Sequence, residues 1–259
     1  MGYGATRRVE FSENFDLTQL KRRRRLRYQR VAGLFEDQIT LTPVSAWLPQ
    51  LQGKDVRQYE EVLDLFGKLL PEDTRLTQAT DNGEVIFSQR GVDVPFSALS
   101  DGYRAYLGWI GDLLYHLVTV CPKDKNLIDL CGVVLLDEVD LHLHPSWQRT
   151  VIGQVSQALP NLQFILTSHS PIITGTLEAA NIFVMETDDA GASQVRQLEE
   201  NVFGRSAEEV LLSSYFDLHT TRAPDFEDEL HEIAKRAWKG DKQAAVEYLK
   251  RLTQGDAES

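Results

Sequence analysis

An apolar run that ends in two adjacent carboxylates constrains this chain more than any other stretch. Val133–Leu136 shows no alternation of polar and apolar residues, and Asp137 and Glu138 follow it directly. Such a run is typical of a parallel strand that is covered on both faces. Ligands of open α/β sheets bind at the carboxyl ends of such strands. The stretch therefore predicts a parallel sheet with an acidic site suited to Mg²⁺-nucleotide chemistry.

The segments that follow continue the strand–helix–strand pattern. Pro145 fits the first position of a helix over residues 146–159. Residues 161–167 form a second apolar strand, which ends in Ser168-His169-Ser170-Pro171. This alternation argues for an α/β fold with a parallel sheet. Two more strands are predicted at residues 181–185 and 194–198.

A strong amphipathic helix precedes the acidic strand. Apolar residues recur every three or four positions from Tyr106 to Val118, which indicates a helix with one buried face. Ser100 or Asp101 is a natural N-cap for it. The free amides and the helix dipole of the first turn would suit an anion. A plain capped helix is the alternative interpretation.

The pattern divides the chain into three predicted regions. Residues 1–96 are expected to form a mostly helical lobe that is closed by a small hairpin. Residues 97–200 form the α/β core, and residues 201–259 form a helical C-terminal extension. Within that extension, helices are predicted over residues 207–216, 224–239 and 242–252.

Bulk properties narrow the class of protein. Hydrophobic residues make up 42% of the chain, enough for a substantial core, but no apolar run approaches the roughly 20 residues of a membrane span. Met1–Glu10 lacks the apolar centre of a secretory signal. Two cysteines, Cys121 and Cys131, cannot build a disulfide framework. These features predict a cytoplasmic protein with no membrane partner.

Charge is distributed unevenly along the sequence. The net charge is −12, yet the first 30 residues hold nine Lys/Arg against three Asp/Glu, which leaves 18 against 36 elsewhere. The excess is concentrated in a basic run from Lys21 to Arg30. Such a run could contact the phosphates of nucleic acid. The alternative is a solvated face that offsets the acidic remainder.

Taken together, four motifs resemble those of ABC-type ATPases of the RecF, SMC and OLD-like group, and within it the bacterial AAA-family ATPases of defence and virulence-linked operons. The matches are to the signature motif, Walker B, the D-loop and the switch-histidine loop. In that order the matching residues are Leu99–Arg104, Val133–Glu138, Val139–Pro145 and Leu166–Pro171.

The resemblance implies ATP and Mg²⁺ as cofactors and assigns roles to residues. Asp137 would hold Mg²⁺ through a water, Glu138 would be the general base, and His169 would donate a hydrogen bond to the γ-phosphate. Ser100, Asp101 and Gly102 would form the nucleotide-binding signature, with Ser100 and Gly102 reaching a nucleotide held by a second subunit. Asp140 would lie at the interface of a homodimer. A nuclease is a further partner that the resemblance suggests.

One motif of the family is not found in the sequence. ATPases of this type need Gly-x-x-x-x-Gly-Lys-Ser/Thr, whose amides and lysine cradle the phosphates. Gly67-Lys68 is followed by Leu69 and lies in a predicted helix. We therefore expect a partial ABC-ATPase (P-loop NTPase) fold without the P-loop lobe. It would be an ATP-binding and ATP-hydrolysing switch subunit that is inactive alone and pairs with a second subunit or a missing N-terminal fragment.

Two other functions remain open. The first is a non-catalytic scaffold that retains the fold and the dimer surface of such an ATPase. The second is a metal-dependent nuclease that uses Asp137, Glu138, His142 and His144. The His-x-His spacing alone is a weak metal signal. The retention of Asp137, Glu138 and His169 favours the ATPase interpretation.

Overall fold

The computed structural model describes residues 1–5, 7, 31–36, 39–71, 74–79, 85–188 and 190–254. The chain divides into two compact units, Met1–Glu178 and Ala179–Ser259. The finer division predicted at residues 96 and 200 stays a prediction. The basic run from Lys21 to Arg30 lies outside the described residues.

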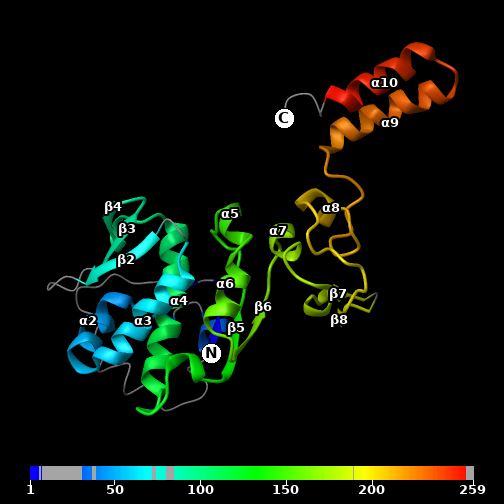
Figure 1. Ribbon diagram of the computed structural model, residues 1–259. Helices are drawn as coiled ribbons and strands as arrows, with labels where there is room; N and C mark the ends of the chain where they lie inside the picture. Colours follow the sequence, from blue (N-terminus) through cyan, green and yellow to red (C-terminus); the bar gives the residue numbers. More distant parts are fainter. Residues whose placement is uncertain are drawn as a thin grey trace. The chain divides into compact units, whose positions relative to one another are not determined.

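The first unit contains a parallel sheet (Figure 1). Its strand order is β1–β5–β6, and both pairs of neighbours are parallel. The predicted α/β fold with a parallel sheet is therefore confirmed. The strands are β1 Gly2–Tyr3, β5 Gly132–Leu136 and β6 Leu162–Leu166.

Helices pack against one face of this sheet. Val134 and Leu136 of β5 are buried in the same core cluster as Leu107 and Val151, and α4 and α6 run beside β5 and β6 in Figure 1. Within the described residues, the helices of the unit are α2 Val44–Lys54, α3 Val56–Leu69, α4 Asp101–Val120, α5 Pro145–Gln148, α6 Val151–Ala158 and α7 Pro171–Thr174.

The opposite face is only partly covered, which corrects the prediction of a strand buried on both sides. Val133 is 46% exposed and Ile165 is 52% exposed. Successive side chains of a strand point to opposite faces. Among the described residues, the covering helices therefore bury alternate positions of the apolar run and leave the others at the surface.

The predicted helix over residues 146–159 is divided in two. Helix α5 ends at Gln148 and α6 begins at Val151, with a turn between them. At the break, the amide of Thr150 donates to the carbonyl of Trp147 (2.9 Å), three residues back, in place of the four-residue spacing of an α-helix. The Trp147 ring packs edge-on against Tyr103 of α4, with centroids 4.0 Å apart.

A small antiparallel sheet precedes α4. Its strands β2 and β3 pair with each other, and β3 pairs with β4. Arg90 and Gly91 both have positive φ, at 52° and 80°, as a two-residue hairpin turn of this kind requires. The predicted turn at residues 81–83 lies outside the described residues. The strands are β2 Thr74–Ala79, β3 Val85–Gln89 and β4 Val92–Pro95.

Short 3₁₀ turns connect several of these elements. They are η2 Ala32–Leu34, η3 Phe96–Ala98, η4 Leu127–Asp129 and η5 Ala179–Asn181. The turn η2 packs beside β1, where the amide of Gly4 donates to the carbonyl of Gly33 (2.9 Å). None of the helices in the described part of the chain has the length and apolar character that crossing a bilayer requires.

The second unit opens with a hairpin and corrects another prediction. Strands β7 Val184–Thr187 and β8 Ser193–Arg196 pair with each other antiparallel, and they do not extend the parallel sheet. The turn explains the pairing. The carboxylate of Asp188 accepts hydrogen bonds from the amides of Ala190 and Ala192, and Gly191 has φ +81°.

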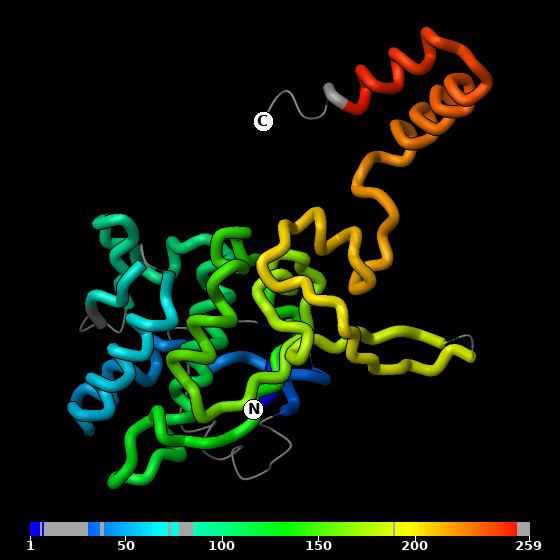
Figure 2. Tube along the Cα trace, turned by 45° about the vertical axis from the view of Figure 1, so that its right-hand side comes forward, coloured from blue at the N-terminus to red at the C-terminus, as the bar shows by residue number. Residues whose placement is uncertain are grey.

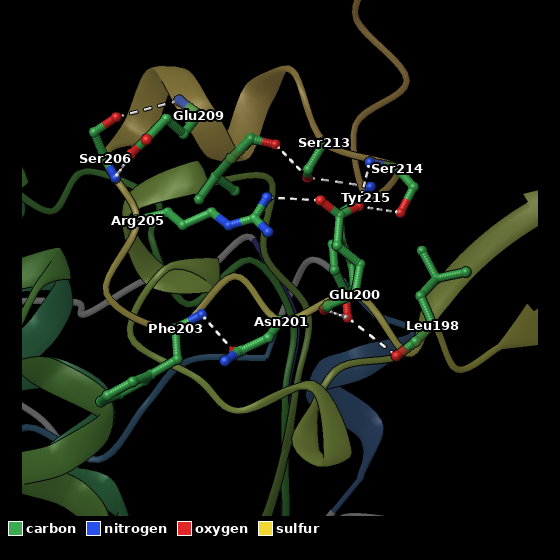
Figure 3. Close-up of polar contacts among 11 residues, drawn as sticks. Leu198, Glu200, Asn201, Phe203, Arg205, Ser206, Glu209, Ser213, Ser214 and Tyr215 are labelled. Atoms are coloured by element: carbon green, nitrogen blue, oxygen red, sulfur yellow. Dashed lines mark hydrogen bonds and ion pairs between the residues drawn. The ribbon is translucent and has the colours of Figure 1, made fainter.

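Three helices complete this unit. Helix α8 is shorter than predicted, whereas α9 and α10 match the predicted helices to within two residues and lie side by side as a pair (Figure 2). The segment before α8 is organised around Glu200, whose carboxylate accepts hydrogen bonds from Arg205 and Ser214 (Figure 3). The helices are α8 Ala207–Leu211, α9 Pro224–Trp238 and α10 Lys242–Gln254.

Candidate nucleotide site

The acid pair lies at the carboxyl edge of the parallel sheet, as the sequence predicts. The amide of Asp137 donates to the carbonyl of Tyr3 (2.8 Å), and the amide of Thr167 donates to the carbonyl of Leu136 (3.0 Å). These bonds extend the ladders of β1–β5 and β5–β6 by one residue. Asp137 and the segment that leads to His169 therefore end neighbouring strands at the same edge.

Thr167 joins the two strand ends through its side chain. Its Oγ1 accepts a hydrogen bond from the amide of Glu138 (2.8 Å), and its hydroxyl donates to Oδ1 of Asp137. Its carbonyl also accepts from the amide of Val139 (3.0 Å). Sequence reasoning did not single out Thr167, although it directly precedes the Ser-His pair. Its role depends on the register between β5 and β6, which the sequence does not reveal.

Arg7 is a second site residue that sequence reasoning missed. It follows β1, and its Nη2 donates to the carbonyl of Glu138 (2.6 Å). Burial lowers the pKa of the guanidinium to about 10, while the carboxylates of Asp137, Glu138 and Asp140 act in the opposite direction. Arg7 is therefore still a cation at neutral pH. Its position in the sequence could have identified it, because Arg7 follows a parallel strand and ligands bind at the carboxyl ends of such strands. The acid pair was predicted from the same rule.

Asp140 lies in the turn after the acid pair. Its carbonyl accepts from the amide of Leu143 (2.9 Å). Its Oδ1 is buried and has no hydrogen-bond partner within the part of the chain that the structure describes. A buried carboxylate oxygen without a donor is costly, and the nearby charge of Arg7 offsets part of that cost.

The predicted signature residues form the start of α4. Ser100 is the N-cap residue by its extended backbone, but its hydroxyl makes no capping bond. Asp101 pairs with Arg104 one turn later. A Cβ built on Gly102 would lie 2.4 Å from the carbonyl oxygen of His142. The first turn of α4 therefore touches the loop that follows the acid pair.

His169 is exposed on the loop between β6 and α7. No hydrogen bond among the described residues joins its ring to Asp137 or Glu138. The neighbouring Ser170 is buried and caps α7, since its Oγ accepts from the amide of Ile173 (3.2 Å) and its hydroxyl donates to Gln148 (2.6 Å). The structure thus fixes the loop through Ser170 and leaves the side chain of His169 exposed.

The two histidines of the His-x-His pattern do not gather with the acids around a metal position. In the described ranges, no group of three or more His, Cys, Asp or Glu side chains is arranged to hold a metal ion. His144 has a structural contact, because its Nδ1 lies 2.8 Å from Oγ of Ser146 and 3.2 Å from the Ser146 amide at the start of α5. Asp137, Glu138 and the Thr167 hydroxyl supply oxygen donors, which suit Mg²⁺ shared with a nucleotide's phosphates.

A parallel sheet with two acids after one strand, and a Thr-Ser-His segment after the next, defines an α/β core of the ABC-ATPase type. The sequence profile of one family matches residues 14–174, more than half of the chain. The chain belongs to this family, which is described as "AAA domain, putative AbiEii toxin, Type IV TA system". This confirms the resemblance to an ABC-type AAA ATPase of bacterial defence systems.

Curated relatives agree with this assignment. The chain is 34% identical over 125 residues to the retron Ec83 probable ATPase of Escherichia coli, a match over 48% of this chain and 23% of the relative. It is 27% identical over 232 residues to the Septu protein PtuA of Bacillus mycoides, over 88% of this chain and 30% of the relative. The chain thus spans about a quarter to a third of the length of these relatives. Together these matches support an ATPase-type function.

Solved structures with similar folds include SMC head domains. One, from a study of ATP-driven dimerization and DNA-stimulated activation of SMC ATPases, is 18% identical with a TM-score of 0.41 and covers 60% of this chain and 89% of that one. The head domain from Thermotoga maritima has a TM-score of 0.39, is 18% identical and covers 60% of this chain and 52% of that one. These scores are too low to add to the family assignment.

Proposed function

We propose that this chain supplies the acidic half of an ATP-hydrolysing site in an ABC-type ATPase that works as a switch. The observation that carries the proposal is the shared carboxyl edge of β5 and β6. Asp137 and Glu138 follow β5, and Thr167 follows β6. The Thr167 hydroxyl group donates a hydrogen bond to Oδ1 of Asp137, and its oxygen accepts one from the amide of Glu138. Phosphoryl transfer depends mainly on positioning and charge stabilisation, and this arrangement fixes the Asp137 carboxylate and the Glu138 backbone at one edge of the sheet.

Each residue has a distinct role in the proposed reaction. Asp137 would hold Mg²⁺, which would neutralise charge on the phosphates when it is bound. Glu138 orients the attacking water and takes its proton. His169 donates a hydrogen bond to the γ-phosphate as negative charge develops there.

The signature residues act on a second nucleotide. Ser100 and Gly102 reach the γ-phosphate of ATP held by another subunit, with Asp101 beside them, and Asp140 lies at the interface between the subunits. The contact of Gly102 with the carbonyl of His142 supports this coupling, since it joins the signature turn to the loop that carries Asp140. The proposed assembly is a homodimer that closes on ATP and acts on nucleic acid or with a nuclease partner.

The phosphate cradle has to come from elsewhere. No Gly-x-x-x-x-Gly-Lys-Ser/Thr run occurs in the 259 residues, and Gly67-Lys68 lies inside α3. The proposal therefore includes a P-loop on another polypeptide stretch, and it states that this chain does not turn over ATP alone. The same missing motif favours a second candidate function, a non-catalytic scaffold that keeps only the fold and its interfaces.

Measurements of ATP hydrolysis separate these functions. The chain is assayed alone and with a polypeptide that carries an apolar strand and a P-loop, taken from one of the longer relatives. We expect hydrolysis only in the mixture, with a loss of at least 100-fold in Glu138→Gln. Glu199→Gln, which changes an exposed glutamate of the second unit, is the matched control and keeps full activity.

Three results would contradict the proposal. Hydrolysis by the chain alone that Glu138→Gln abolishes would remove the need for a separate P-loop. Hydrolysis in the mixture that survives Glu138→Gln would remove Glu138 as the base. A mixture that forms a stable complex but neither binds nor hydrolyses ATP would establish the scaffold.

A further inference from the structure

Glu138 is held by its backbone from two sides. Its amide donates to Oγ1 of Thr167 (2.8 Å), and its carbonyl accepts from Nη2 of Arg7 (2.6 Å). Arg7, Glu138 and Thr167 follow β1, β5 and β6 respectively. These contacts therefore tie together the carboxyl ends of all three strands of the parallel sheet, with Glu138 in the middle.

The backbone conformation of Glu138 is unfavourable without these two hydrogen bonds. Its φ is +47°, in the left-handed region that costs a non-glycine residue about 1–2 kcal/mol. A strained backbone persists only where surrounding contacts over-determine it. The two hydrogen bonds act on the two peptide units that flank the Glu138 Cα, so they hold both φ and ψ.

Arg7 is a poor choice for stability alone. Its Nε and Nη1 are buried and find no hydrogen-bond partner among the described residues. Buried donors without acceptors cost free energy. The guanidinium also lies close enough to Asp137, Glu138 and Asp140 to interact with all three charges. Among the described residues, the guanidinium donates its hydrogen bond to the carbonyl of Glu138, so it holds this peptide group in addition to balancing the three carboxylates.

We propose that Arg7 is a positioning residue which, with Thr167, fixes the backbone of Glu138 and so aims its carboxylate at the attacking water. The catalytic purpose of this positioning rests on the proposed function. The clamp, by which we mean the hydrogen bonds that join the Glu138 backbone to Arg7 and Thr167, is present in the chain without nucleotide. Arg7 acts through Glu138, without a contact to the nucleotide. Thr167 also donates a hydrogen bond to the carboxylate of Asp137. Its hydroxyl and the Arg7 guanidinium together hold the Asp137 side chain and the Glu138 backbone.

Hydrogen exchange of the full chain tests the clamp without nucleotide. In Arg7→Met, which keeps an unbranched apolar stem but removes the donors, we expect the amides of Glu138 and Val139 to exchange at least tenfold faster. Arg7→Lys, with one donor group, should lie between Arg7→Met and the unchanged chain. Arg149→Met, at an exposed arginine, is the control with no effect. Unchanged exchange in folded Arg7→Met would overturn the proposal.

Thr167 provides a second route if Arg7→Met does not fold. Thr167→Val is nearly the same shape but lacks the hydroxyl, and it leaves Arg7 in place. We expect the same local increase in exchange, and we expect Thr167→Ser to restore protection. Equal exchange in the valine and serine variants would overturn the clamp.

Kinetics of the mixture with the P-loop polypeptide test the purpose of the clamp. Misplacing a catalytic group by about 1 Å costs about 100-fold in rate. Arg7→Met should therefore lower kcat by about 100-fold and change KM for ATP by less than about twofold. A change confined to KM would show that Arg7 binds nucleotide directly and would overturn its positioning role. If no variant or mixture hydrolyses ATP, the proposed function fails, while the exchange data still decide whether the clamp exists.

Discussion

Gly102 is the residue at which the start of α4 meets the loop after the acid pair. Its Cα faces the carbonyl oxygen of His142 so closely that an added Cβ would lie 2.4 Å away. The obstacle is backbone, which cannot rotate aside as a side chain can. His142 also has φ +64°, so its loop has little freedom to move.

We predict that Gly102→Ala destabilises the chain by about 1–3 kcal/mol, the usual range for overpacking. Urea unfolding measures the effect. Gly67→Ala is the matched control, because Gly67 lies inside α3 and nothing stands within 4 Å of its added Cβ. That change should stabilise by up to about 1 kcal/mol, the difference in helix propensity. Equal effects of the two substitutions would show that the contact with His142 is not tight.

At the scale of single residues, the sequence predicted the acids but not what holds them. Asp137 and Glu138 could be placed because a strand end is visible in the local pattern. Arg7 and Thr167 could not, because their contacts depend on which strands are neighbours and in which register. Arg7 lies 131 positions from Glu138 in the sequence. Local periodicity carries no information about a pairing over that distance.

At the scale of elements, a buried carboxylate joins β1, α4 and the segment before α2. Tyr3 donates its hydroxyl to Oδ2 of Asp112 (3.0 Å), and the amide of Thr42 donates to Oδ1 (2.8 Å). His116 lies one turn further along α4, with Nε2 3.3 Å from Oδ2. Asp112 and Tyr3 are both buried. The strand that positions Arg7 is thus fixed to the helix that starts at the signature residues.

We predict that Asp112→Asn destabilises the chain by about 3 kcal/mol, because an amide nitrogen would replace one of two oxygens that accept buried hydrogen bonds. Asp124→Asn, at an exposed aspartate, is the matched control for urea unfolding.

The pKa of Asp112 is lowered from its ordinary value of 3.8. Burial acts to raise this pKa, but the hydrogen bond and charge of His116 and the hydrogen bonds from Thr42 lower it by more. The stability that this carboxylate contributes is therefore present above pH 3.8 and lost as the pH falls through the lowered pKa. Other carboxylates titrate in this range too, so we expect a shallower pH dependence in Asp112→Asn, and a dependence as steep as that of the unchanged chain would contradict this assignment.

The elements themselves were predictable to different degrees. Helices α3, α4, α9 and α10 follow from strong local periodicity and from clear caps or stops. The pairing of β7 with β8 did not follow, because two short strands can extend a parallel sheet or fold back on each other. The turn around Asp188 decides between these, through bonds from the carboxylate to two amides. The break between α5 and α6 did not follow either, because the apolar spacing of residues 146–159 is continuous across it.

At the scale of the whole molecule, charge separates the first 30 residues from the remainder. The former carry a net charge of +6, whereas the remaining residues carry −18. Net repulsion between the acidic remainder and a polyanion would oppose binding of nucleic acid, so attraction has to come from the basic run. Each phosphate contact releases counterions, which makes such binding depend steeply on salt.

We predict that the chain binds duplex DNA through Lys21–Arg30 and that changing Arg22, Arg23, Arg24 and Arg25 to glutamine weakens this binding. The slope of log K against log salt should become shallower by about 0.9 for each phosphate that the variant no longer neutralises. Fluorescence anisotropy with a labelled duplex at several salt concentrations measures both quantities. Changing Lys123, Arg149, Arg222 and Lys239 to glutamine, four exposed basic residues outside the run, is the control for the loss of four positive charges alone. An unchanged slope in the quadruple variant, or an equal loss in the control, would show that the basic run is a solvated face and makes no phosphate contacts.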